Sequence, residues 1–164
     1  MTEPKTGSEK IKQPRRSRAE TREAAINGIL DIATEEFVEK GLAGARIDEI
    51  GDRATKRKIY YYFGSKDELY RAVLERAYRQ VRSSEVEVDM DSGSATDALR
   101  RLIEHDDRYH SQHPELVRLV MNENIHRAEH LKQIPGMQER NRGVITLLSG
   151  IIERGQREGI FRPD

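Results

Sequence analysis

Apolar residues recur every three or four positions along most of this chain, which is the spacing of one buried helix face. The clearest case is residues 21–40, which carry Ile26, Ile29, Leu30, Ile32, Ala33, Phe37 and Val38. Gly41 predicts the end of that helix, because glycine readily adopts the left-handed conformation that closes helices. Similar patterns predict helices over 47–54, 55–63, 66–82, 94–111 and 137–156, another from Pro114, and partial helix over 125–134. The fold class is therefore all-α.

One short segment, residues 55–66, is basic at its start and aromatic along its length. Thr55 is placed to cap the helix, and Ile59 and Phe63 lie four residues apart, so they share a face that can be buried. Gly64 ends the helix, and Ser65 begins a capping box for the next one. The residues left on or beside the exposed side are Lys56, Arg57, Lys58, Tyr60 and Tyr61.

This basic and aromatic surface has two interpretations. It is either a solvated charged helix whose tyrosines belong to the core, or a surface whose cations and hydroxyls contact nucleic-acid phosphates. The preceding short helix over residues 47–54 favours the second interpretation. Two short helices in succession, the second of them basic, form a helix-turn-helix pattern.

Composition and charge agree with a DNA-binding first half. The chain of 164 residues has no cysteine and is 35% charged, which excludes a disulfide framework and cysteine-based metal sites. No apolar run has the length of a membrane span or a signal peptide, so we expect a cytoplasmic protein without membrane contact. Residues 1–82 hold 18 Lys and Arg against 14 Asp and Glu, whereas residues 83–164 hold 11 against 15. A polyanion is thus expected to bind the first half.

These patterns divide the chain into three parts. Residues 1–20 are expected to be a disordered basic arm, either a solubilising tail or an arm that settles along DNA. Residues 21–66 are expected to form a three-helix DNA-binding domain, and residues 67–164 a second helical domain. A longer linker helix over residues 66–82 joins the two, and residues 83–95 are expected to be a loop.

The run Gly28-Ile29-Leu30-Asp31-Ile32-Ala33, together with Phe37, Lys40-Gly41, Ile47, Ile50 and the segment 56–69, resembles the DNA-binding domain of TetR-family transcriptional regulators. The Tyr60-to-Lys66 run is the most specific part of this resemblance. The resemblance implies that Lys66 binds a phosphate and that the recognition helix begins near Lys56. The DNA-contacting residues it implies are Arg46, Thr55, Lys56, Arg57, Lys58, Tyr60, Tyr61, Tyr62 and Lys66.

One departure from the family pattern falls inside the helix-turn-helix. Family members usually carry two more residues between the positions of Ala54 and Thr55. Two residues turn a helix by roughly 200°, so their loss changes which side chains face outward. The turn is built differently, or the helices fuse or shorten, or the sequence lacks two residues of its natural form. The last interpretation is favoured because both flanking segments match in register.

The resemblance further implies a ligand-responsive repressor that acts as a homodimer on a palindromic operator in double-stranded DNA. Its effector would be a small molecule, and no cofactor is expected. Family members are commonly longer and pair two C-terminal helices from each subunit, so we expect a smaller dimer interface or a fragment here. The residues expected to line the effector pocket are Tyr109, His110, Met121, Asn122 and His126.

Two other functions are alternatives to DNA binding. The run from His126 to His130, with Glu129, matches the inverted zinc-protease pattern and would make a metal-binding protein or metallohydrolase if both histidines lay on one helix face. The match is short, and Glu123 is the only candidate for a third ligand. A helical protein-interaction module without a DNA role is favoured only if the short turn abolishes the recognition geometry.

Overall fold

The computed structural model describes residues 17–163, and these form a chain of α-helices with one short 3₁₀ segment. The amino-terminal helices are α1 (Arg18–Gly44), α2 (Ile47–Arg53) and α3 (Lys56–Phe63). They are followed by α4 (Lys66–Val86), α5 (Ala95–Gln112), α6 (Pro114–Ile125), the 3₁₀ segment η1 (Leu131–Gln133) and α7 (Met137–Arg157). The expected all-α fold is confirmed for the described residues.

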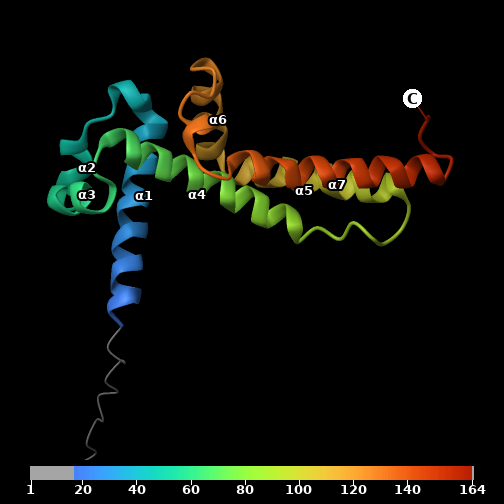
Figure 1. Ribbon diagram of the computed structural model, residues 1–164, viewed down its shortest axis with the longest axis horizontal. Coiled ribbons are helices and arrows are strands. Elements are labelled where there is room, and N and C mark those ends of the chain that lie inside the picture. Colours follow the sequence, from blue (N-terminus) through green and yellow to red (C-terminus); the bar gives the residue numbers. More distant parts are fainter. Residues whose placement is uncertain (1–16, 164) are drawn as a thin grey trace, which may run out of the picture.

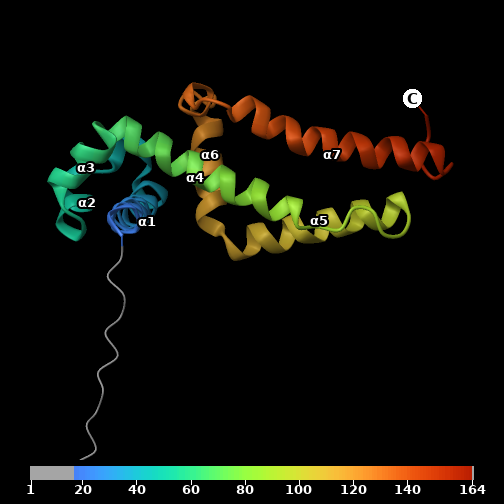
Figure 2. The same ribbon diagram turned by 60° about the horizontal axis from the view of Figure 1, so that its bottom comes forward.

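The helices are arranged along an elongated molecule. Figure 1 shows α1, α2 and α3 gathered at one end, with α4 leading away from them toward α5 and α7 at the other end. Figure 2, turned by 60°, shows α6 between these two parts. Helix α6 packs on α1, while α5 and α7 pack on each other and each also touches α4. Helix α4 is therefore the element that connects the two ends.

The main hydrophobic core lies at the amino-terminal end. Phe37 of α1 and Tyr70 of α4 pack edge to face, with ring centroids 5.0 Å apart. Each of the small helices contributes a fully buried isoleucine, Ile50 from α2 and Ile59 from α3. Leu119 of α6 reaches the same core, so the carboxy-terminal half is joined to the amino-terminal half by shared apolar packing.

A smaller core lies between α5 and α7. Its buried members are Ala95, Ala98, Leu102 and Ile151, with Leu147, Leu148 and Phe161 partly buried around them. The loop before α5 is fixed by guanidinium groups: Arg101 donates to the Asp89 carbonyl at 2.7 Å, and Arg154 donates to the Met90 carbonyl at 2.8 Å. This region contains few large buried side chains.

Several expected helix boundaries were wrong. Helix α1 begins at Arg18, inside the expected arm, because Ser17 and Glu20 form a reciprocal capping box. The rest of that arm, residues 1–16, lies outside the described residues. The helix kinks at Gly41, whose φ of 66° is left-handed as expected, but helical residues continue to Gly44. Helix α4 runs to Val86, so the first residues of the expected loop over 83–95 are helical.

Candidate nucleic-acid interface

Helices α2 and α3 remain separate and meet at a two-residue turn. Ala54 and Thr55 are both extended, with φ of −115° and −92°, so the helices neither fuse nor run on into each other. The tight turn brings the start of α3 against Gly51, where an added Cβ would lie 2.9 Å from the Cβ of Lys56. The short link is thus accommodated by a glycine that sequence reasoning had not singled out.

Helix α3 buries one face and exposes the other. Ile59 is fully buried, as expected, whereas Phe63 is only partly buried. Gly64 ends the helix with a φ of 79°, a left-handed conformation that glycine adopts without strain. Tyr60 and Tyr61 are 48% and 80% exposed, and Lys56, Arg57 and Lys58 are exposed beside them. A convex ridge of cations and phenols results, which is the chemistry that contacts phosphates and groove edges.

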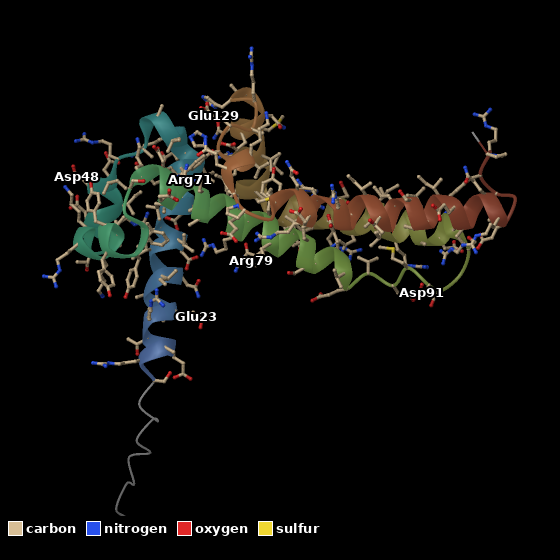
Figure 3. All side chains as sticks on the ribbon, viewed as in Figure 1. Glu23, Asp48, Arg71, Arg79, Asp91 and Glu129 are labelled. Carbon is tan, nitrogen blue, oxygen red and sulfur yellow. The ribbon has the colours of Figure 1, made fainter. Side chains whose placement is uncertain are left out.

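The first cation of this ridge is already paired. Lys56 bonds to the carboxylate of Asp48 on α2, which Figure 3 shows at the helix-turn-helix end of the molecule. The hydrogen bond and charge of Asp48 raise the pKa of Lys56, and Lys56 lowers the pKa of Asp48 in return. Among the described residues, no carboxylate lies within ion-pair distance of Arg57 or Lys58. These two side chains are therefore the unpaired cations of the ridge.

The remaining expected DNA contacts surround α3. Tyr62 is partly buried, packs edge to face on Tyr61 at 5.0 Å, and has the guanidinium of Arg22 5.9 Å from its ring centre. Thr55 occupies the N-cap position, but its side chain makes no capping hydrogen bond. Arg46 is exposed just before α2. The structure thus brings these residues to the same end of the molecule.

Lys66 lies at the start of α4, where Ser65 caps the helix by accepting from the Glu68 amide at 3.1 Å. The ammonium group of Lys66 is turned partly inward and donates to the Ala45 carbonyl at 3.1 Å. Lys66 consequently braces the link between α1 and α2. Two of its three N–H donors stay available for other acceptors.

Ion pairs fix α2 against α1. Lys40 of α1 bonds to Glu49 of α2 and lies 3.0 Å from Glu36, and Arg53 of α2 bonds to Glu35 of α1 at 2.6 Å. The hydrogen bond to Lys40 lowers the pKa of Glu49 and raises that of Lys40. The pairs to Glu49 and Glu35 are largely exposed, so each adds little stability, but both join α2 to α1.

The residues expected to line an effector pocket do not lie together. Tyr109 lines a cavity of about 560 Å³ between α1, α4, α5 and α6, and its ring stacks on His113 at 4.1 Å. Asn122 and His126 line a second cavity of about 300 Å³ near the start of α4. His110 and Met121 are exposed and line neither of these two cavities.

The two histidines of the zinc-protease pattern do not share a helix face, so that geometric expectation was wrong. Helix α6 ends at Ile125, and Arg127 and Ala128 adopt left-handed conformations that turn the chain. His126 is hydrogen-bonded to the Asn122 carbonyl at 2.8 Å, and His130 to the Glu123 carboxylate at 3.2 Å. Within residues 17–163, no group of three or more His, Asp or Glu side chains is arranged to hold a metal.

The fold and this exposed basic helix define a helix-turn-helix protein of the DNA-binding class. Comparison with known proteins identifies it further. Residues 29–73 match the model of the bacterial regulatory proteins of the tetR family, and residues 96–164 match that of the tetracyclin repressor-like C-terminal domain. The chain belongs to the TetR family of transcriptional regulators, as the sequence resemblance implied, and this is a family of DNA-binding regulators and not of enzymes.

Individual relatives support the same assignment. The chain is 34% identical to the transcriptional repressor NicS of Pseudomonas putida, over 90% of this chain and 70% of that protein. It is 35% identical to the transcriptional repressor SCO4008 of Streptomyces coelicolor, over 76% of this chain and 69% of that one. The crystal structure of the TetR-family regulator PfmR from Thermus thermophilus has the same fold, with a TM-score of 0.65 and 24% identity over 83% of this chain and 74% of that chain.

Proposed function

We propose that this protein is a ligand-responsive transcriptional repressor that binds a palindromic operator as a homodimer. The observation that carries the proposal is the exposed ridge of α3, where Arg57 and Lys58 pair with no carboxylate of residues 17–163 and lie beside Tyr60 and Tyr61. In a dimer, two such helices would enter successive major grooves about 34–36 Å apart. The two relatives that are named as repressors support repression as the direction of the regulation.

Dimerisation is proposed through α7. Ile145 and Ile152 lie seven residues apart on this helix, so they share a face, and they are 60% and 46% exposed. Leu148 lies between them and is only partly buried. An exposed aliphatic stripe of this kind is favourable to bury against a second copy. Among residues 17–163, no helix has the length and apolar character needed to cross a membrane.

The effector is proposed to bind in the cavity that Tyr109 lines. The cavity has apolar walls from Val73, Leu116 and Leu119 and polar groups from Thr34 and Gln80. Mixed walls of this kind, in a cavity of several hundred cubic ångströms, suit a small organic molecule. Because α1 and α4 contribute walls as well, an occupant would contact the helices that position α2 and α3. Acting on bacterial DNA, such a repressor would work in the cytoplasm.

The proposal is tested by selecting duplexes that the full chain binds from a random pool. We expect a palindromic motif whose half-sites are centred about 10–10.5 base pairs apart, bound by two chains. A motif without two-fold symmetry, or the absence of any enriched motif, would contradict the proposal. Analytical ultracentrifugation of the complex counts the chains.

Two lysine variants then distinguish a contact to the phosphate backbone from a contact that reads the base sequence. Lys66→Ala is expected to weaken binding to selected and scrambled duplexes alike and to reduce the salt slope by about one. Lys58→Ala is expected to change the ranking among operator sequences instead. Melting temperatures control for the bond from Lys66 to Ala45. If both variants lost the same affinity on all duplexes, the result would count against the proposed DNA-contact roles of the two lysines.

A further inference from the structure

The buried carboxylate of Glu123 lies near the end of α6, at the junction of the two halves of the molecule. Glu123 is 2% exposed, which is unusual for a carboxylate, since burying a charge is costly unless it is hydrogen-bonded. Its Oε1 is hydrogen-bonded to His130 Nδ1 at 3.2 Å, and its Oε2 accepts from the Leu131 amide at 3.1 Å. Both partners belong to the turn after α6, so Glu123 ties that turn back to its own helix.

The same carboxylate lies beside Tyr70 of α4. Tyr70 is 2% exposed and packs edge to face on His130, with ring centroids 5.2 Å apart. Burial, and after it the neighbouring Glu123 carboxylate, raise the pKa of Tyr70 above its ordinary range. Because Tyr70 also packs on Phe37 of α1, these side chains connect α6, α4 and α1 in one cluster. We call Tyr70, Glu123, His130 and Leu131 the Glu123 cluster.

The turn that the cluster holds is strained. Arg127 and Ala128 have φ of 57° and 56°, a conformation that residues with a side chain rarely adopt. Such strain persists only where the surroundings over-determine the backbone. Here the Ala128 amide donates to the Glu123 carbonyl at 2.7 Å, and Arg71 of α4 donates to Gln133 Oε1 at 2.6 Å. Glu123 and Arg71 thus fasten both ends of this turn, and Arg71 joins its far end to α4.

Apolar packing is interrupted next to the cluster. The cavity of about 300 Å³ that Asn122 lines lies between the end of α1, the start of α4 and the end of α6. Tyr70, Glu123 and His130 are among its walls, and so is Lys66. Lys66 and Tyr70 are four residues apart on α4 and share a face. The cluster therefore links Glu123 of α6 and His130 of the following turn to Tyr70, one turn from Lys66 on α4.

We propose that Glu123 is a positioning residue for operator binding, which holds α4 against the turn after α6 and so fixes the orientation of α3 relative to the regulatory helices. This inference rests on the proposed function, because orientation matters only where two recognition helices must fit one operator. Weakening the cluster should reduce specific binding more than general phosphate binding. Sequence-independent contacts tolerate changes of orientation that a palindromic site does not.

The test compares Glu123→Gln with Glu129→Gln in the full chain. Glu129 is an exposed glutamate on the same turn (Figure 3), so its replacement makes the same change of charge without touching the cluster. Affinity is measured for a duplex selected by the wild type and for a scrambled duplex, well below each melting temperature. We expect Glu123→Gln to weaken binding to the selected duplex by about tenfold, within the range of residues that couple two sites. Binding to the scrambled duplex, and both affinities of Glu129→Gln, should stay within about twofold.

A double-mutant cycle with Tyr70→Phe distinguishes positioning from a purely structural role. The two substitutions should be non-additive in operator affinity, because both act through one cluster. If Glu123→Gln melts earlier yet binds the selected duplex as the wild type does, the inference is overturned. If Glu123→Gln does not fold, Tyr70→Phe alone decides, and wild-type affinity for that variant overturns the inference. A wild type that selects no duplex would overturn the proposed function and this inference together.

Discussion

The two ends of this molecule are stabilised in different ways. At the amino-terminal end, large side chains such as Phe37, Tyr70 and Leu69 are buried in a core that α1 to α4 build with residues of α6 and α7. At the other end, α5 and α7 meet over Ala95, Ala98 and Leu102, while Ile145 and Ile152 of α7 face outward. The first region keeps its large apolar side chains covered. The second exposes apolar surface that a second copy would cover.

The largest effects should come from large-to-small substitutions that compare the two cores. Phe37→Ala is expected to lower the free energy of unfolding by about 3–5 kcal/mol, because α1, α2 and α4 cannot close the cavity. Leu102→Ala should cost about 2–3 kcal/mol, since the α5–α7 contact can collapse more easily. Urea denaturation of both variants measures the difference. Equal losses would mean that the α5–α7 region is as well packed as the amino-terminal core.

A charge on the exposed stripe of α7 tests whether that region depends on a second copy. Ile152→Glu should convert the dimer to a monomer and lower operator affinity by about 100-fold, because the two half-sites are no longer bound together. Glu153→Gln, at the next exposed position, serves as the control. Sedimentation and gel-shift titration give the two readouts. A monomeric wild type, or an Ile152→Glu variant that remains dimeric, would remove the proposed role of this stripe.

Alanine substitutions at two glycines of the amino-terminal region should change the stability of the protein in opposite directions. Gly51→Ala should destabilise the protein by about 1 kcal/mol or more, because the new methyl group meets Lys56 at the tight turn. Gly28→Ala should stabilise it by about 0.5–1 kcal/mol, because an added Cβ in the middle of α1 meets no atom within 4 Å. Thermal unfolding of the two variants and the wild type measures both changes in stability. Destabilisation by Gly28→Ala would show that Gly28 faces a crowded side of α1.

The smallest effect should come from the loop before α5. Hydrogen bonds from Ser92 and then from the Asp91 amide lower the pKa of Asp89 to about 2. Because this folded-state value is below the unfolded value of about 3.9, the contribution of Asp89 is present above that pH and is lost as the pH falls toward 2. Asp89→Asn should therefore lower the melting temperature at pH 6 by on the order of 1–2 °C, and the difference should disappear as the pH falls through 2. If the melting temperatures of Asp89→Asn and the wild type followed the same curve against pH, the stabilising role of Asp89 would be contradicted.

Sequence reasoning succeeded where one local signal decides the structure. The helical periodicity, the cap at Ser65, the left-handed Gly64 and the burial of Ile59 all follow from a few neighbouring residues. The start of α1 at Ser17 was missed even though Ser17 and Glu20 carry a capping-box signature. The Ser-, Asp- and Gly-rich composition of residues 83–95 suggested a loop, whereas the last turn of α4 is helical and buries Glu85. Neighbouring residues thus predicted where the helices lie but did not predict all of their ends.

Long-range contacts account for most of what sequence reasoning missed. The burial of Glu123 depends on Tyr70 and on the turn at Arg127, which no pattern in the sequence indicated. The separation of His126 from His130 has the same origin. Lys66 was expected at a phosphate, and its bond to the Ala45 carbonyl depends on how α1 meets α4. The roles of Lys66 and of the other expected DNA contacts remain predictions that the lysine variants test.

The ion pair between Lys56 and Asp48 bears on how the protein leaves wrong sequences. If a duplex phosphate draws Lys56 away from Asp48, the freed carboxylate lies near the phosphates and repels them. Engagement of this lysine is thus a net exchange of one anion for another, unlike that of Arg57 or Lys58. In the proposed complex, Asp48 would then act as a built-in counter-ion that weakens random encounters, and residence on DNA would depend on the contacts that only a matching operator supplies.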